Sequence, residues 1–284
     1  MVPAVRRRPL AALCRRFDGR GRAFRPRQRL WLLAAVLPAL AVCVPAGAAA
    51  RNARSGSGLL FNGSNKSAWF DQSATSTRIR RVSNPAGTGT ALRFQTYNQD
   101  VFPLTPTSNP RAQLVAPLPI SVGDQFWESY EVYLPRSFPV AATYHGWLAL
   151  GSPAYGAPWA GSPPVELAIN DGHFRFQRDG YAAYPWQIAW QAPLVLGRWV
   201  RFTWHVQLSR TGFVQLYMDN QPLELSNGSS ASTTLFMPVL DPSDDRGPWV
   251  STLQVYYRHD EFPQVTVYFR DFRIARTEAL AVGN

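Results

Sequence analysis

The residues best suited to chemistry lie near the C-terminus, in the stretch Leu253–Ile274. Large and polar residues alternate there in two runs, at 253–258 and 265–270, and a short acidic segment containing Pro263 separates the runs. This pattern predicts two β-strands joined by a tight loop.

The first run carries two tyrosines and an arginine, Tyr256, Tyr257 and Arg258. Neighbouring side chains of a strand point to opposite faces, so we expect Tyr256 and Arg258 on one face and Tyr257 on the other. A phenol beside a guanidinium suits binding of a sugar acid or proton transfer to it. Tyrosine and arginine are also ordinary cross-strand partners, so a structural role stays open.

Of the four histidines, His145 is the best candidate for catalysis. The small Gly146 follows it and leaves room for a ligand, and a histidine can gain or lose a proton near neutral pH. His205 lies between bulky residues in a predicted strand, which favours a structural role. His173 follows a turn and is expected to be exposed.

Several kinds of catalytic site are not supported by the sequence. It contains no His-Glu-x-x-His zinc motif and no Gly-x-Ser-x-Gly nucleophile motif. Glu128 and Glu131 lie three residues apart on one predicted strand, so their side chains face opposite sides and cannot both address one glycosidic bond. We therefore predict no cofactor and no catalytic metal, and a structural calcium ion is left open.

The first fifty residues read as a targeting segment. Ten arginines precede an apolar run at 30–44, which ends in a cluster of small residues at 46–50. This order is typical of a secretory signal peptide, which we predict at 1–50. The protein is then expected outside the cell or in the periplasm, without a membrane segment after cleavage.

Removing this segment changes the meaning of the net charge of +11. Residues 1–50 hold 10 arginines and one aspartate, which leaves 19 basic and 17 acidic residues beyond them. A nearly neutral domain does not suit nucleic-acid binding, so that class of partner is excluded. Both cysteines, Cys14 and Cys43, also lie in the segment, and the remaining chain can form no disulfide.

The rest of the chain is predicted to be all-β. Residues 51–60 are rich in Gly, Ser and charge and are expected to form a flexible leader, and 61–284 a single domain. Short alternating segments recur without a helical period, which predicts a two-sheet antiparallel β-sandwich. The stretch 151–164 is rich in Gly, Pro and Ala and is expected to be a long loop.

Several motifs occur in the order seen in one group of enzymes. They are Asn109-Pro110-Arg111-Ala112-Gln113-Leu114, His145-Gly146, Ser162-Pro163-Pro164-Val165-Glu166-Leu167, the tract from Phe174 to Pro193, Gly197-Arg198-Trp199-Val200, and Tyr257-Arg258 ahead of Val267-Tyr268-Phe269-Arg270-Asp271. Over roughly 61–281 the chain resembles polysaccharide lyases of the heparin lyase I, alginate lyase and glucuronan lyase group.

The resemblance implies a concanavalin A-like β-jelly roll that cleaves uronic-acid polysaccharides by β-elimination. In that case Arg111 neutralises the uronate carboxylate, with Gln113 holding it, and His145 is the base or a second neutralising group. Tyr257 is implied as the acid, and its use as the base as well is left open. From the residues themselves, we also expect substrate contacts from Tyr256, Arg258, Trp147 and Trp159. The expected partner is an acidic polysaccharide, bound by a monomer.

The chain departs from the group's pattern at three positions. Thr143 stands where a glutamine is usual, Gln113 replaces a commoner glutamate, and Tyr256 occupies the place of a small residue. Two alternatives therefore remain. A lectin-like jelly roll would bind sugar through Trp147 or Trp159 without cleaving it, and a glycoside hydrolase on the same fold would depend on a carboxylate such as Glu166.

Overall fold

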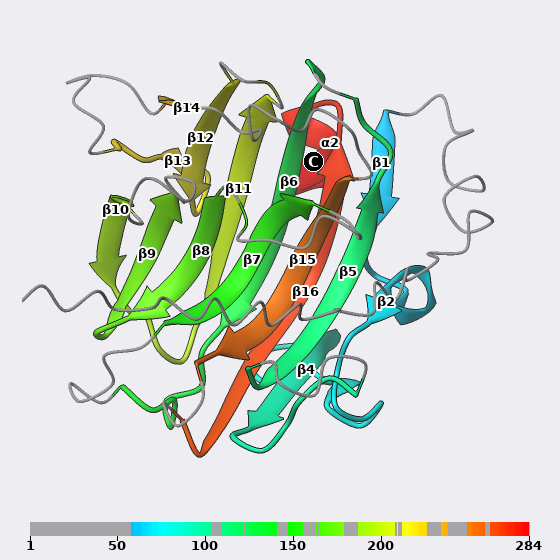
Figure 1. Ribbon diagram of the computed structural model, residues 1–284, viewed down its shortest axis with the longest axis vertical. Helices are drawn as coiled ribbons and strands as arrows, with labels where there is room; N and C mark the ends of the chain where they lie inside the picture. The colour runs from blue at the N-terminus through cyan, green and yellow to red at the C-terminus, as the bar shows by residue number, and fades with distance from the viewer. Residues whose placement is uncertain are drawn as a thin grey trace, which may run out of the picture. The chain divides into compact units, whose positions relative to one another are not determined.

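The computed structural model of the chain describes residues 58–103, 109–121, 123–140, 147–155, 163, 165–178, 187–207, 209, 212–225, 234–237, 249–258 and 262–283. These residues form two antiparallel β-sheets that pack face to face (Figure 1). The predicted all-β sandwich of the concanavalin A-like jelly-roll type is thus confirmed. Residues 1–57, which contain the predicted signal peptide and most of the predicted leader, lie outside the described part of the chain.

The first sheet has seven strands in the order β10-β9-β8-β7-β15-β5-β2. In chain order they are β2 (Phe70–Asp71), β5 (Arg111–Leu118), β7 (Leu148–Tyr155), β8 (Val165–Asn170), β9 (His173–Arg178), β10 (Gln187–Pro193) and β15 (Trp249–Tyr257). Figure 1 shows this sheet towards the viewer.

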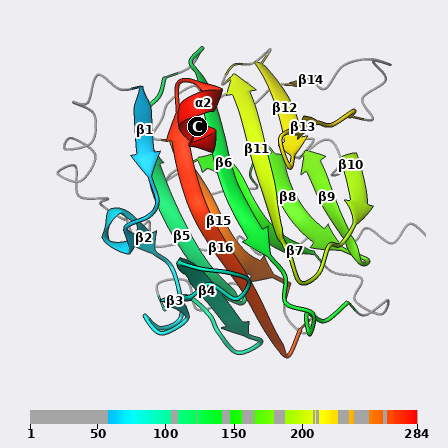
Figure 2. The ribbon, with the colours of Figure 1, turned by 180° about the vertical axis from the view of Figure 1, so that it is seen from behind.

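The second sheet has nine strands, with β13-β12-β11-β6-β16-β4-β3 as its main path, β1 paired with β16 and β14 with β12. They are β1 (Leu59–Asn62), β3 (Ile79–Ser83), β4 (Thr90–Tyr97), β6 (Gln125–Tyr133), β11 (Trp199–Gln207), β12 (Gly212–Met218), β13 (Gln221–Pro222), β14 (Thr234–Met237) and β16 (Gln264–Ala275). Two short helices complete the described elements, η1 (Lys66–Ala68) and α2 (Glu278–Val282), and α2 packs on β16, β6 and β11 (Figure 2). Among the described residues, no helix is both long and apolar enough to cross a membrane.

Strand alternation explains the core between the sheets. On β6, Phe126, Tyr130 and Val132 are almost completely buried in the core cluster, and Glu128 shares their inward face. The odd-numbered residues of the strand alternate with them on the outer face. On β15 the inward residues are Leu253, Val255 and Tyr257, all fully buried. Burial of such side chains from both sheets is the main source of stability of a domain of this size.

The two strands predicted in the C-terminal stretch are present, but they belong to different sheets. β15 pairs with β5 and β7, whereas β16 pairs with β4, β6 and β1. The loop between them therefore crosses from one sheet to the other. Two runs of alternating large and polar residues predict that two strands follow each other in the chain. They do not predict whether the two strands hydrogen-bond to each other.

Three features of the fold differ from the sequence predictions: the start of the first strand, a short C-terminal helix and the start of a loop. Leu59 and Leu60, expected in the flexible leader, belong to β1, because their backbone pairs with β16 and the next residue, Phe61, is buried. α2 was not expected, since a helix of five residues is too short to show a period. The expected long loop 151–164 instead begins as part of β7.

Close packing of the two sheets explains why the start of β7 was predicted to be a loop. A Cβ atom on Gly151 would lie 2.6 Å from the hydroxyl oxygen of Tyr130 and 3.2 Å from the backbone oxygen of Thr252. The glycine that suggests a loop in the sequence is thus required where the two sheets approach closely.

Candidate active site

The candidate site lies on the outer face of the seven-stranded sheet, where β5 and β15 are neighbours. In this antiparallel pair Arg111 lies opposite Tyr256, and Gln113 lies opposite Gln254. Ala112, between the two β5 residues, is completely buried in the core. Directly paired residues share a face of the sheet, so these four polar side chains line one outer surface.

Tyr256 is held in place by three neighbours. The guanidinium carbon of Arg111 lies 4.6 Å from the centroid of its ring, and the ring of Trp147 lies 4.9 Å away at 67°. Asn109 Nδ2 donates a hydrogen bond of 3.5 Å to the phenolic oxygen. A cation over an aromatic face and an edge-on ring are both attractive arrangements. The phenol is therefore oriented before any ligand binds.

Arg111 is a half-buried cation with unused binding capacity. Burial lowers the pKa of its guanidinium, and the interaction with Tyr256 partly offsets that shift. The group still carries its charge at neutral pH, because arginine does not lose its proton in proteins. Its Nε atom is buried and has no hydrogen-bond partner among the described residues. A carboxylate would satisfy both the charge and the free donors.

Tyr257, the predicted acid, lies on the opposite face of β15. Its side chain is fully buried in the core and packs on Phe262, with the ring centroids 5.2 Å apart. Its hydroxyl has no hydrogen-bond partner within the described residues, and burial, with a smaller effect of Asp100, raises its pKa well above the usual value. A polymer on the surface cannot contact this hydroxyl, so the role expected of Tyr257 does not fit its position.

The structure brings together four of the eight residues predicted for the site: Arg111, Gln113, Tyr256 and Trp147. Arg258 is exposed and follows the end of β15. His145 and Trp159, together with the unusual Thr143, lie outside the described residues. Their predicted roles therefore stay predictions.

Two neighbours of the site, Gln254 and Asn109, were not predicted. Gln254 is nearly buried and faces Gln113 across the strand pair. Gln254 lies two residues before Tyr256 on β15, and side chains two residues apart on a strand share a face. The sequence would therefore have identified Gln254 once β5 was known to be the partner strand. Asn109 precedes β5, and no local pattern distinguishes it from a turn residue.

The acidic residues of β6 are separated as strand alternation predicts. Glu128 is fully buried in the core and accepts a hydrogen bond from Ser251 Oγ, and burial raises its pKa to about 8. Glu131 lies on the outer face of the nine-stranded sheet, ion-paired with Arg201 and Arg270. Neither faces the candidate site, which counts against a hydrolase built on this strand.

A carboxylate does lie on the site's own sheet, on β8. Glu166 is 5% exposed and accepts a hydrogen bond of 2.8 Å from Gln177 Nε2 of β9. β8 is separated from β15 by β7, so Glu166 is two strands away from Tyr256. The separation across the strands is roughly 10 Å at about 4.8 Å per strand. Glu166 is also displaced along them, because the β8 residue in line with Tyr256 is Ala168. Glu166 therefore lies beside the candidate site on the same sheet, without belonging to the Arg111–Tyr256 pair.

Comparison with solved structures agrees with this architecture. Alginate lyase A1-II′, a member of polysaccharide lyase family 7, superposes with a TM-score of 0.50 at 12% identity, over 71% of this chain and 84% of that chain. A variant of the same enzyme in complex with product gives 0.50 at 10% identity, with the same two coverages. An endo-β-1,4-glucuronan lyase from the fungus Trichoderma reesei gives 0.49 at 16% identity, over 78% and 93%. At identities of 10% and 12%, the two alginate lyase structures show a likeness of fold alone.

Sequence comparison gives the family. A search of curated proteins finds no significant match. The sequence profile of the family described as Polysaccharide lyase matches residues 61–236, which is more than half of the chain and includes β5, β6 and the strands β7 to β12. The chain therefore belongs to the polysaccharide lyase family.

Proposed function

We propose that this polysaccharide lyase cleaves a uronic-acid-containing polysaccharide by β-elimination on the outer face of the seven-stranded sheet, after export directed by residues 1–50. The observation that carries the proposal is the pairing of Arg111 with Tyr256 on adjacent strands, with the guanidinium 4.6 Å from the phenol ring. This pair supplies a half-buried positive charge and a proton-carrying hydroxyl on one surface.

Arg111 has the first role in the proposed reaction. A uronate carboxylate holds its α-proton tightly because removing it would place a second negative charge on the same group. Hydrogen bonds from a guanidinium neutralise the carboxylate and stabilise the charge that develops as the proton leaves. The partial burial of Arg111 strengthens this effect, because electrostatic interactions are weakly screened away from water.

The bonds then rearrange as follows. A base removes the α-proton, and its electron pair forms a double bond between the α- and β-carbons. The bond from the β-carbon to the glycosidic oxygen breaks, and the Tyr256 hydroxyl donates its proton to that oxygen. We assign the base to His145, as the resemblance implies, and the acid to Tyr256 instead of Tyr257, because only Tyr256 shares a face with Arg111.

The reaction is tested by its product. The protein from residue 51 onward is incubated with alginate, glucuronan, heparin, hyaluronan and pectate, and ultraviolet absorbance is followed. We expect absorbance to rise with at least one of these polymers, since elimination creates a conjugated unsaturated uronate. Binding without any rise would identify a lectin-like module, and release of saturated reducing ends would identify a hydrolase.

Replacing Arg111 by Gln is expected to lower kcat/KM about 100-fold, the usual cost of losing a group that stabilises developing charge. Arg111→Lys should lose less, about tenfold, because the charge stays but the two-pronged geometry is lost. The control is Arg81→Gln, which removes the same charge from β3 in the other sheet. Equal losses in the Arg111 and Arg81 variants would mean that only overall charge matters and would contradict the role of Arg111.

A further inference from the structure

A line of five side chains crosses the outer face of the nine-stranded sheet. Arg80 of β3 lies opposite Arg93 of β4, Arg93 opposite Tyr268 of β16, Tyr268 opposite Tyr133 of β6, and Tyr133 opposite Trp199 of β11. Because directly paired residues share a face, all five lie on one surface, which we call the arginine–aromatic row. It spans five strands, or roughly 19 Å at about 4.8 Å per strand.

The buried neighbours of these residues show that the row faces outward. Each strand places an apolar side chain next to the row residue in the core between the sheets: Ile79, Phe94, Val267, Val132 and Val200. Since successive side chains alternate, the row lies on the other face, away from the candidate active site. Figure 2 shows this sheet towards the viewer.

Among the described residues, no carboxylate compensates the two arginines at one end of the row. Arg80 is exposed and Arg93 half-buried, and among the described residues neither forms an ion pair. The Nε atom of Arg93 is buried and has no hydrogen-bond partner there. Like charges directly opposite on paired strands destabilise a sheet. An anionic group lying between the two guanidinium groups would remove that repulsion and use the free donors.

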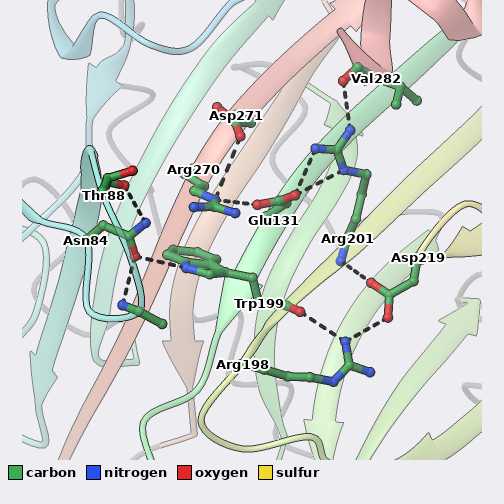
Figure 3. A network of polar contacts seen from close by, with 11 residues as sticks. Asn84, Thr88, Glu131, Arg198, Trp199, Arg201, Asp219, Arg270, Asp271 and Val282 are labelled. Carbon is green, nitrogen blue, oxygen red and sulfur yellow. Dashed lines mark hydrogen bonds and ion pairs between the residues drawn. The ribbon is translucent and has the colours of Figure 1, made fainter. Parts of the chain in front are cut away.

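The aromatic end of the row is held rigidly. The rings of Tyr268 and Tyr133 lie 5.8 Å apart, and those of Tyr133 and Trp199 lie 5.4 Å apart. Trp199 Nε1 donates a hydrogen bond of 3.0 Å to Asn84 Oδ1, and the guanidinium carbon of Arg270 lies 4.3 Å from the Trp199 ring centroid (Figure 3). Binding here would cost little conformational entropy, because the side chains are already ordered.

We propose that the arginine–aromatic row is a second binding site for an anionic polysaccharide, separate from the active site. The acid groups of the polymer bind Arg80 and Arg93, and its sugar rings pack on the half-buried rings of Tyr268 and Trp199. The choice of a uronate polymer as occupant rests on the proposed function. Such a site would hold the enzyme on its polymer while the other sheet acts on a chain.

The test uses affinity gel electrophoresis of the protein from residue 51 onward, in gels containing alginate, pectate or heparin, with dextran as the neutral reference. The variant Arg80→Gln/Arg93→Gln is compared with Arg81→Gln/Arg136→Gln, which removes two charges from exposed positions outside the row. We expect retardation by an anionic polymer to fall at least fivefold in the first variant and to stay within twofold in the second. Initial rates on short oligosaccharides should stay unchanged in both.

Three results would overturn the second site: unchanged retardation of the Arg80/Arg93 variant, an equal loss in the control variant, or no retardation of the parent protein by any anionic polymer. The outcome is separable from that of the proposed function. An active enzyme with unchanged retardation contradicts only the second site. Row-dependent retardation without unsaturated product contradicts only the lyase reaction.

Discussion

Tyr256→Phe is expected to lower kcat by about 10²–10⁴-fold, the range that a positioned proton donor contributes. The ring, with its contacts to Arg111 and Trp147, stays in place, and only the hydroxyl that protonates the glycosidic oxygen is lost. Binding of the polymer should therefore change by no more than about twofold. The measurement is initial-rate kinetics by ultraviolet absorbance on the polymer that the parent enzyme cleaves, with affinity electrophoresis of the same variant.

The neighbouring Tyr257 offers a matched control. Tyr257→Phe removes the same atom one residue away, from a side chain that is fully buried on the other face of β15. Its hydroxyl has no hydrogen-bond partner among the described residues, so its removal should leave kcat within twofold and not reduce stability. If instead Tyr257→Phe abolished turnover and Tyr256→Phe did not, the assignment of the acid to Tyr256 would be wrong.

The buried Glu128 is expected to make stability fall as pH rises. Burial raises its pKa from 4.5 to about 8, the hydrogen bond from Ser251 opposing this only in part. Below pH 4.5 the carboxyl is protonated in both the folded and the unfolded protein. Between pH 4.5 and about 8 the unfolded state loses the proton while the folded state keeps it, so the free energy of unfolding falls by about 1.4 kcal/mol per pH unit.

Glu128→Gln isolates this effect, since glutamine resembles the protonated acid and does not titrate. Urea unfolding of both proteins at pH 5, 6.5 and 8 gives the difference in the free energy of unfolding, in which the titration of all other groups cancels. We expect the wild type to lose several kcal/mol relative to the variant between pH 5 and 8. A difference that does not change with pH would show that Glu128 is not kept protonated by the fold.

The sequence by itself determined the class of the domain and the pairing of side chains within each strand. Alternation predicted that Glu128 and Glu131 lie on opposite faces of one strand, and the structure confirms this. The bulky neighbours of His205 in its strand predicted a structural role for this residue. Its ring stacks on Trp127 at 4.1 Å, and its two ring nitrogens contact Gln215 and Gln125. These are local properties, because a period of two needs no knowledge of a partner strand.

Only the tertiary structure decided which face of each strand meets the core. On β15 both faces carry a tyrosine, so alternation separates Tyr256 from Tyr257 without saying which is buried. The register of β15 with β5 sets Tyr256 opposite Arg111, about 145 residues earlier in the chain, and this pairing depends on packing of the whole sheet. The arginine–aromatic row depends in the same way on the register of five strands, of which only β3 and β4 follow each other in the chain. Long-range pairing is fixed by burial of the shared core, which no single segment contains.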